Sequence, residues 1–221
     1  MDTFDHETLQ GQIEGLVNTA YETSALCRSE REAVCESMGG MVEAMVTLVV
    51  VRDPATGQHS QQVADLVLQL ALDMGLPVAE AQMFAWAGCL HDVGKLVIPD
   101  ALLQKRGSLT VEEWELMRVH PAVGGDIVSH IPVLRPLAPV IRAHHERWDG
   151  QGYPDGLKGE TIPSGARILM VADAYLAMTV DRPYQQARAP SVALAELCRY
   201  AGSQFDPQVV TALKQILKCS H

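Results

Sequence analysis

Residues 63–74 read VADLVLQLALDM, and the spacing of their apolar side chains decides which class of fold the chain adopts. One stripe of apolar residues recurs at intervals of three and four: Val63, Leu66, Val67, Leu70, Ala71 and Met74. This spacing places the stripe on one face of an α-helix, whereas a half-buried strand would alternate apolar and polar residues. Gly75 and Pro77 then break the chain, and a second, largely apolar helix is expected from about residue 79 to residue 91.

Helix start signals continue along the rest of the chain. The expected first residues or caps of further helices are Thr110, Pro121, Ser164 and Asp206. Thr110 and Glu113 have the spacing of a capping box, and Asp206 followed by Pro207 is typical of an N-cap with proline at the first helical position. The one extended-looking stretch, residues 46–51, is equally compatible with a helix. The sequence therefore predicts an all-α fold.

The composition is acidic and suited to a globular core. Of the 221 residues 48% are apolar, and the formal net charge is -10, which argues against a protein that coats nucleic acid or an anionic membrane. No apolar run reaches the ~18 residues of a membrane helix, and the N-terminus MDTFDHETLQ is not typical of a secretory signal. Five cysteines without a CxxC pair indicate reduced thiols, so we expect a cytoplasmic protein.

The pair Gly39-Gly40 interrupts the helical pattern and suggests a division of the chain. Residues 1–38 are expected to form an N-terminal helical segment that serves as a linker or as the contact of a homodimer. The alternative is that they pack on the main domain, which is expected to comprise residues 39–221.

Five histidines and two aspartates lie at expected helix ends or inside apolar helices: His59, His91, Asp92, His120, His144, His145 and Asp173. Asp173 lies within the apolar run ARILMVADAYLAM, where an unpaired carboxylate is strongly unfavourable. His59 is expected to open the helix that carries the Val63 stripe, and Lys95 follows the His91-Asp92 pair on the same helical face.

Helical bundles build metal sites from inward-facing side chains of this kind. Mixed imidazole and carboxylate ligands suit iron, manganese, zinc or nickel in an open catalytic site, and the lack of a cysteine in the set argues against a closed structural zinc site. The alternative is a set of buried polar residues that satisfy one another in a helical core.

The chain resembles the HD-GYP family, a branch of the HD superfamily of metal-dependent phosphohydrolases. The motifs that carry the resemblance are HDVGKLVIPD (91–100), HPAVGGDIV (120–128), HHERWDGQGYPDGLKGETIPSGARI (144–168), VADAY (171–175), DRPY (181–184) and QFDP (204–207). The resemblance implies a helical bundle with a metal centre in its core. It also implies hydrolysis of cyclic-di-GMP to linear pGpG, which family members often continue to GMP.

The resemblance also implies a role for each residue of the set. The core metal ligands of the superfamily correspond to His59, His91, Asp92 and Asp173. The ligands of a second metal correspond to His120, His144 and His145, with Asp92 bridging the two metals. The implied cofactors are two divalent transition metal ions, iron first, with manganese, nickel or zinc as alternatives, and the implied nucleophile is a hydroxide that bridges them.

Further residues correspond to the family's substrate contacts. Lys95 matches the lysine at the scissile phosphate, so Lys95 and Asp92 are the expected catalytic residues, and Arg182 matches an arginine that grips the substrate phosphate. Gly152 and Tyr153 begin the GYP loop, which is associated with the rim of the site and with partners such as diguanylate cyclases that carry a GGDEF domain. Neither a nucleic-acid polymer nor a membrane is expected as a partner.

The chain departs from the family pattern at four positions. Ala55 stands where some members have a glutamate that recruits a third metal, so two metals are expected rather than three. Leu176 replaces a second aspartate, and Gln62 and Gln185 stand where basic residues are usual. These departures keep two alternatives open. One is a catalytically weak signalling adaptor, and the other is an HD phosphohydrolase that acts on another cyclic dinucleotide such as cyclic GMP-AMP.

Overall fold

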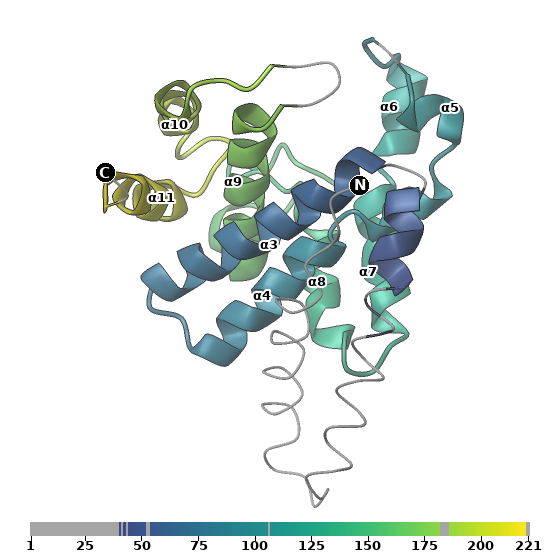
Figure 1. Ribbon diagram of the computed structural model, residues 1–221, viewed down its shortest axis with the longest axis horizontal. Helices are drawn as coiled ribbons and strands as arrows, with labels where there is room; N and C mark the ends of the chain where they lie inside the picture. The colour runs from purple at the N-terminus through teal and green to yellow at the C-terminus, as the bar shows by residue number, and fades with distance from the viewer. Residues whose placement is uncertain are drawn as a thin grey trace, which may run out of the picture.

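The computed structural model describes residues 40, 42, 44–51, 54–105, 107–181 and 186–219, apart from the side chains of residues 54–58 and 219. Within these residues every regular element is a helix, which confirms the predicted all-α class (Figure 1). Residues 46–51 belong to a helical segment, 44–51. The predicted N-terminal helical segment, 1–38, lies outside the described residues, and the division at Gly39-Gly40 stays a prediction.

The longer helices are α3 (Pro54–Asp73), α4 (Val78–Leu90), α7 (His120–Ser129), α9 (Ser164–Thr179), α10 (Pro190–Arg199) and α11 (Pro207–Cys219). The shorter helices are α5 (Asp100–Leu103), α6 (Val111–Met117) and α8 (Ala138–Arg142), with 3-10 turns η1 (Val93–Val97), η2 (Arg135–Leu137) and η3 (Gly159–Thr161). Among the described residues, none of these helices is both long enough and apolar enough to cross a membrane.

The helices α3 and α4 form an antiparallel pair at the centre of the molecule (Figure 1). The predicted stripe of α3 faces this core, since Val63, Val67 and Leu70 are fully buried. Helix α4 is apolar on all sides from Phe84 to Leu90, and every residue of this part is buried. This part of α4 can be apolar on every face because the helices α3, α8 and α9 all pack against α4.

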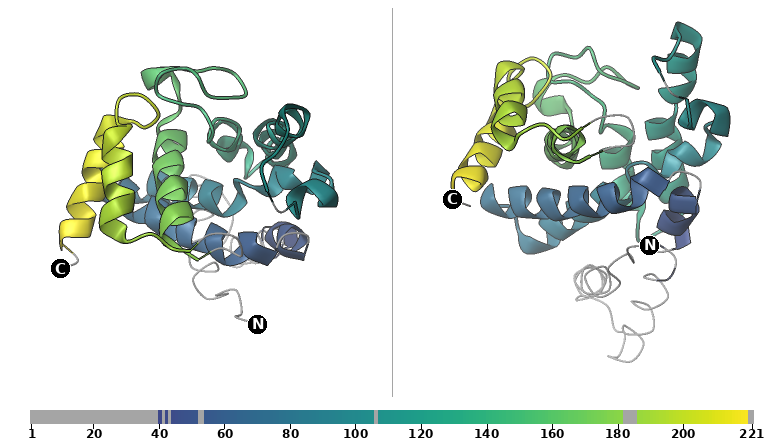
Figure 2. Two further views of the ribbon diagram at one scale, coloured as in Figure 1. Left: turned by 90° about the horizontal axis from the view of Figure 1, so that it is seen from above. Right: turned by 45° about the horizontal axis from the view of Figure 1, so that its top comes forward.

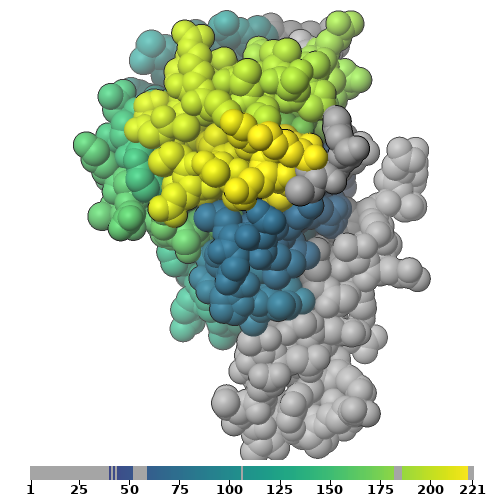
Figure 3. Space-filling view, turned by 90° about the vertical axis from the view of Figure 1, so that its left-hand side faces the viewer, coloured from purple at the N-terminus to yellow at the C-terminus, as the bar shows by residue number. Residues whose placement is uncertain are grey.

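The remaining helices lie at the two ends of this pair. Seen from above, α9, α10 and α11 stand side by side at one end, while α5 and α6 lie at the other (Figure 2). Helix α11 packs directly on α3, and Figure 3 shows the yellow helix lying against the blue helical pair. The metal-ligand candidates come from the region between these two ends.

Two of the predicted helix starts, at Thr110 and Asp206, are found in the structure, and the predictions for Ser164 and His59 differ from it. Thr110 forms the predicted capping box with Glu113, and the Asp206 carboxylate accepts a hydrogen bond of 2.8 Å from the Gln208 N–H. Ser164 is the first residue of α9 and makes no capping hydrogen bond, because Pro163 occupies the cap position. Helix α3 begins at Pro54, so His59 does not open the helix but lies inside it.

The start of α11 is tied to the loop that follows α8. Arg167 on α9 donates a 2.6 Å hydrogen bond to the Asp206 carboxylate, and its guanidinium lies 5.8 Å from the ring centroid of Trp148. The Trp148 N–H donates to the Gln204 carbonyl at 3.1 Å. The C-terminal helices therefore hold the loop that carries His144 and Tyr153 in a fixed position.

We predict that Asp206→Ala lowers the free energy of unfolding by about 3 kcal/mol, because it leaves the Arg167 cation partly buried without a partner and removes a helix cap. Urea denaturation of protein with matched metal content measures this loss. Asp155→Ala is the control, since the Asp155 side chain pairs with Arg142 but is 38% exposed, against 0% for Asp206. The control is expected to cost under about 1 kcal/mol, and equal losses would contradict the prediction.

Candidate metal centre

The structure brings all seven candidate ligands together from five parts of the chain. They are His59 in α3, His91 and Asp92 after α4, His120 at the start of α7, His144 and His145 after α8, and Asp173 in α9. Six of them form two groups, His59–His91–Asp173 and His120–His144–His145, within each of which the potential ligand atoms lie within 4.8 Å of one another. Each of these groups of histidine and aspartate side chains can hold a metal ion.

Asp92, the seventh candidate, lies between the two groups. Its Oδ2 atom is 3.3 Å from the Nε2 atom of His91, which belongs to the first group. Its Oδ1 atom is 3.6 Å from the Nε2 atom of His120, which belongs to the second. One oxygen of a single carboxylate therefore faces each group, as a bridging ligand requires.

Three of the imidazoles are oriented by the backbone of the preceding helical turn. The Nδ1 atoms of His91, His120 and His144 lie 2.7, 2.8 and 2.6 Å from the carbonyl oxygens of Gly88, Met117 and Ile141. A carbonyl accepts hydrogen bonds only, so Nδ1 carries the hydrogen and Nε2 is left to bind a cation.

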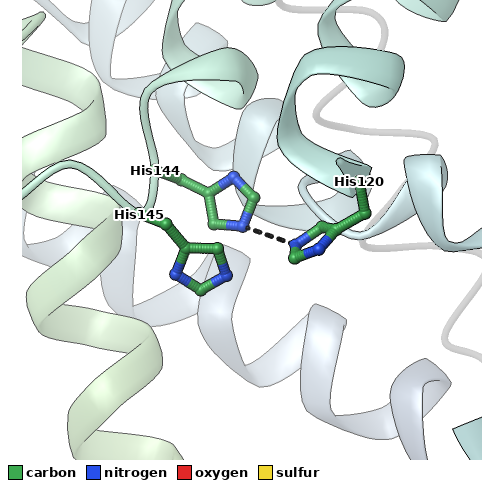
Figure 4. Close-up of side chains that lie close together, drawn as sticks. All are labelled: His120, His144 and His145. Carbon is green, nitrogen blue, oxygen red and sulfur yellow. Dashed lines mark hydrogen bonds between the residues drawn. The ribbon is translucent and has the colours of Figure 1, made fainter. Parts of the chain in front are cut away.

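The second group shows the consequence of this orientation. The rings of His120, His144 and His145 converge on one point, and the Nε2 atoms of His120 and His144 face each other at 3.3 Å (Figure 4). Two neutral rings with hydrogen on Nδ1 would place two lone pairs against each other at this distance. A shared cation removes that repulsion, so the donor set fits a metal better than a self-satisfied polar cluster.

The electrostatics of the buried site favour the protonation states that a metal requires at His144, His145 and Asp92, but not at His91. Burial lowers the pKa of His144 well below its usual value and that of His145 to about 4, so both rings are neutral at neutral pH. Burial alone would raise the pKa of Asp92, but the charges of His91 and Lys95 hold it well below its usual range. Burial alone would lower the pKa of His91, and the carboxylate of Asp92 raises it to about 9. A metal therefore displaces a proton from this ring.

Lys95 lies beside the bridging carboxylate. Its Nζ atom donates a 2.7 Å hydrogen bond to Asp92 Oδ2, and its side chain is 22% exposed while that of Asp92 is 8% exposed. The expected helical relation between these two residues is realised in the 3-10 turn η1. Arg182, the other expected phosphate contact, lies outside the described residues.

Gly94 permits the close approach on which the site depends, and sequence analysis gave it no role. A Cβ atom at this position would lie 1.9 Å from the carbonyl oxygen of His120 and 2.6 Å from the Gly124 nitrogen. Only a glycine lets the turn after Asp92 lie directly on the start of α7. The sequence signal is a single glycine within HDVGK, which by itself does not say what it approaches.

The GYP loop folds back over the second group. The Tyr153 N–H donates to the His145 carbonyl at 3.2 Å, and the ring centroids of these two residues are 5.0 Å apart. Burial raises the pKa of Tyr153 to about 12, so the phenol remains protonated. Gly152 is required by crowding, since a Cβ atom there would lie 2.3 Å from the Arg147 nitrogen.

The carboxylate of Glu146 fixes the same loop from inside. Its Oε1 atom accepts hydrogen bonds of 2.6 Å from the Asp155 N–H and 3.0 Å from the Gly156 N–H. Arg147 and Asp149 pair with each other at 2.6 Å. These contacts give Glu146, Arg147 and Asp149 a structural role in the loop.

Comparison with known proteins finds one matching family model and several relatives. The sequence model of the family described as "HD domain" matches residues 43–209. A cyclic di-GMP phosphodiesterase of Thermotoga maritima is 38% identical over 180 residues, which are 80% of this chain and 49% of that protein. The cyclic di-GMP phosphodiesterase response regulator RpfG of Xanthomonas campestris is 40% identical over 164 residues, 73% of this chain and 43% of that protein.

Other relatives carry a different substrate in their names. A 3'3'-cGAMP-specific phosphodiesterase 2 of Vibrio cholerae is 36% identical over 180 residues, 80% of this chain and 34% of that protein. The chain thus spans about half or less of the length of these curated relatives.

Solved structures share the fold at lower sequence identity. The crystal structure of the Vibrio cholerae cyclic GMP-AMP phosphodiesterase V-cGAP3 has a TM-score of 0.61 at 22% identity and covers 80% of this chain and 48% of that one. Bd1817 from Bdellovibrio bacteriovorus has a TM-score of 0.63 at 21% identity, with 96% of this chain and 71% of that one covered.

We predict that His144→Ala reduces the bound metal from about two ions per chain to about one, because the second group loses a ligand while the first stays intact. Metal analysis of dialysed protein measures the stoichiometry. His130→Ala is the control, since His130 is exposed and its ring Nδ1 atom lies 2.7 Å from the Asp126 carbonyl oxygen. Unchanged metal content in the His144 variant would contradict the assignment.

Complete removal of metal by a chelator is expected to lower the melting temperature by about 5–10 °C, since ligands that bind only the folded chain stabilise it. Differential scanning calorimetry measures the shift, and re-addition of manganese or iron should restore it. An unchanged melting temperature after verified metal removal would place the metals outside the core.

Proposed function

The chain belongs to the HD-domain family, and we propose that its metal centre hydrolyses a phosphodiester bond of cyclic-di-GMP. The observation that carries this proposal is the position of Asp92 between two groups of buried ligands. Two metals held about 3.5–4 Å apart by one bridging carboxylate are a recurrent arrangement for phosphodiester chemistry. The relatives named cyclic di-GMP phosphodiesterases, at 38% and 40% identity, support the choice of substrate.

The residues that would hold the metals are the two groups and the carboxylate between them. Two divalent ions there, iron first, with manganese, nickel or zinc as alternatives, would supply positive charge for the phosphoryl oxygens and an acidified water as nucleophile. Some members of the family that the chain resembles have a glutamate at the position of Ala55, which recruits a third metal. The side chain of Ala55 lies outside the described side chains. We therefore propose two metals.

The chain's own residues bind and orient the reacting group. Lys95 is held by Asp92 at the partly exposed edge of the site, where its ammonium neutralises charge that develops on a phosphoryl oxygen. The reaction adds the oxygen of water to phosphorus and breaks the bond from phosphorus to a 3′ oxygen, which takes up a proton. The product is linear pGpG, and a second cleavage of the same kind yields GMP.

The GYP loop covers the His145 side of the second group. Tyr153 offers a neutral phenol beside His145, and Gly152 keeps the backbone of the loop close to Arg147. We propose that both residues contact the substrate. Arg182 as a phosphate contact and a GGDEF-domain protein as a partner at this loop stay predictions.

A second candidate substrate is 3'3'-cyclic GMP-AMP. The relative named for this dinucleotide, at 36% identity, favours it. The two substrates share the phosphodiester ring and differ in one base. The metal centre acts on the shared part, so the choice between them depends on contacts with the bases.

We predict that metal-loaded protein cleaves cyclic-di-GMP and that Lys95→Met lowers kcat by about 100–1,000-fold with both metals retained, because a fixed cation at the phosphoryl group is lost. Chromatography of the products with parallel metal analysis measures this, and 3'3'-cyclic GMP-AMP is tested beside it. Lys105→Met is the control, since Lys105 also pairs with a carboxylate, that of Glu113.

The two substrates and the metal content separate the alternatives. Two bound ions without cleavage of either dinucleotide would contradict the proposal and favour the signalling adaptor. Faster cleavage of 3'3'-cyclic GMP-AMP than of cyclic-di-GMP would retain the chemistry and change the substrate.

A further inference from the structure

Arg118, at the end of α6, reaches the GYP loop although the two are well separated in sequence. Its guanidinium carbon lies 5.2 Å from the centroid of the Tyr153 ring. The same ring lies 5.0 Å from the ring of His145, one of the candidate ligands. The cation of Arg118 is therefore linked to the metal centre through a single aromatic side chain.

This contact lies on a partly exposed side of the centre, next to the second group. In the second group His120 and His144 are buried, whereas His145 is partly exposed. Tyr153 is also partly exposed, and Arg118 is exposed. A ligand that approaches the second group from solvent on the His145 side therefore passes Tyr153 and Arg118.

The charge of Arg118 is available to an anion. Several other arginines of the described chain are paired with carboxylates: Arg142 with Asp155, Arg147 with Asp149, and Arg167 with Asp206. Among the described residues, Arg118 has no carboxylate partner, and its side chain lies over the Tyr153 ring. A guanidinium stacked on an aromatic ring keeps its N–H edge free for an oxyanion.

A cyclic dinucleotide carries two phosphodiester groups, only one of which reacts at a time. When one phosphodiester group lies at the metal centre, the other lies on the opposite side of a small ring and must be accommodated closer to solvent. The chain has a net charge of -10, so a second anionic group requires a local cation. Arg118 supplies such a cation on the exposed side of Tyr153, and it is separate from Lys95, which pairs with Asp92.

We propose that Arg118, oriented by Tyr153, binds the phosphodiester group of the substrate that is not being hydrolysed. Guanidinium groups bind phosphate through two parallel hydrogen bonds, which fixes orientation as well as position. Arg118 is thus a specificity residue that favours cyclic dinucleotides over ligands with one phosphate. This inference rests on the proposed function for the identity of the substrate.

The test compares binding of a two-phosphate ligand and a one-phosphate ligand to metal-loaded protein by calorimetry. The probes are the hydrolysis-resistant bis-phosphorothioate analogue of cyclic-di-GMP and GMP. We expect Arg118→Gln to weaken binding of the analogue about tenfold and that of GMP less than about threefold. The salt dependence of analogue binding should also be shallower in the variant than in the wild type.

Arg199→Gln is the matched control, because Arg199 is also exposed and lies 5.5 Å from the ring centroid of Tyr200, on the C-terminal helices. It should leave the affinity of both ligands within about twofold. Equal losses for the two ligands in the Arg118 variant, no loss for either, or the same loss in the Arg199 variant would each overturn the inference. Since the assay measures binding, a failure of cleavage is detected separately.

Discussion

The structure depends on one buried carboxylate placed between imidazoles that belong to two different groups. Asp92 faces His91 through one oxygen and His120 through the other, and Lys95 pairs with it from the partly exposed side. A buried aspartate is unfavourable without such partners. Such partners come from several parts of the chain, and the apolar helices bring five segments together around this polar centre.

Two features of the fold position Asp92. The apolar helix α4 is buried throughout its last seven residues, Phe84 to Leu90, and ends where His91 and Asp92 begin, so that the polar pair emerges inside the molecule. Gly94 then allows the following turn to contact the start of α7 directly, which sets the distance between Asp92 and His120. At the far side, Arg167 pairs with Asp206 at the start of α11, and Trp148 of the loop after His144 and His145 contacts both Arg167 and the Gln204 carbonyl.

Much of the architecture was predictable from the sequence because it follows from local patterns. The 3.6-residue periodicity of α3 and the caps at Thr110 and Asp206 depend on neighbouring residues alone. The start of α3 was misplaced because Pro54 and Gly57, residue types typical of turns, belong to the first turns of the helix, which begins at Pro54. Ser164 did not cap α9 because the proline before it already takes the cap position.

The candidate site was predictable only in part. The seven candidate ligands were identified because histidine and aspartate are unusual at the ends of and inside apolar helices, and because the motifs resemble those of a known family. The roles of Gly94 and Arg118 were missed, since each depends on a segment distant in the chain that only the fold brings near. In the sequence, Arg118 has the features of an ordinary surface cation. Only the fold shows that its guanidinium lies over the Tyr153 ring.

The most direct test of the account is an anomalous diffraction measurement on crystals of the metal-loaded protein. We expect two metal peaks about 3.5–4 Å apart, each next to one of the two groups, with the Asp92 carboxylate between them. A single peak, or two peaks that Asp92 does not join, would contradict the central claim that this carboxylate bridges a binuclear centre.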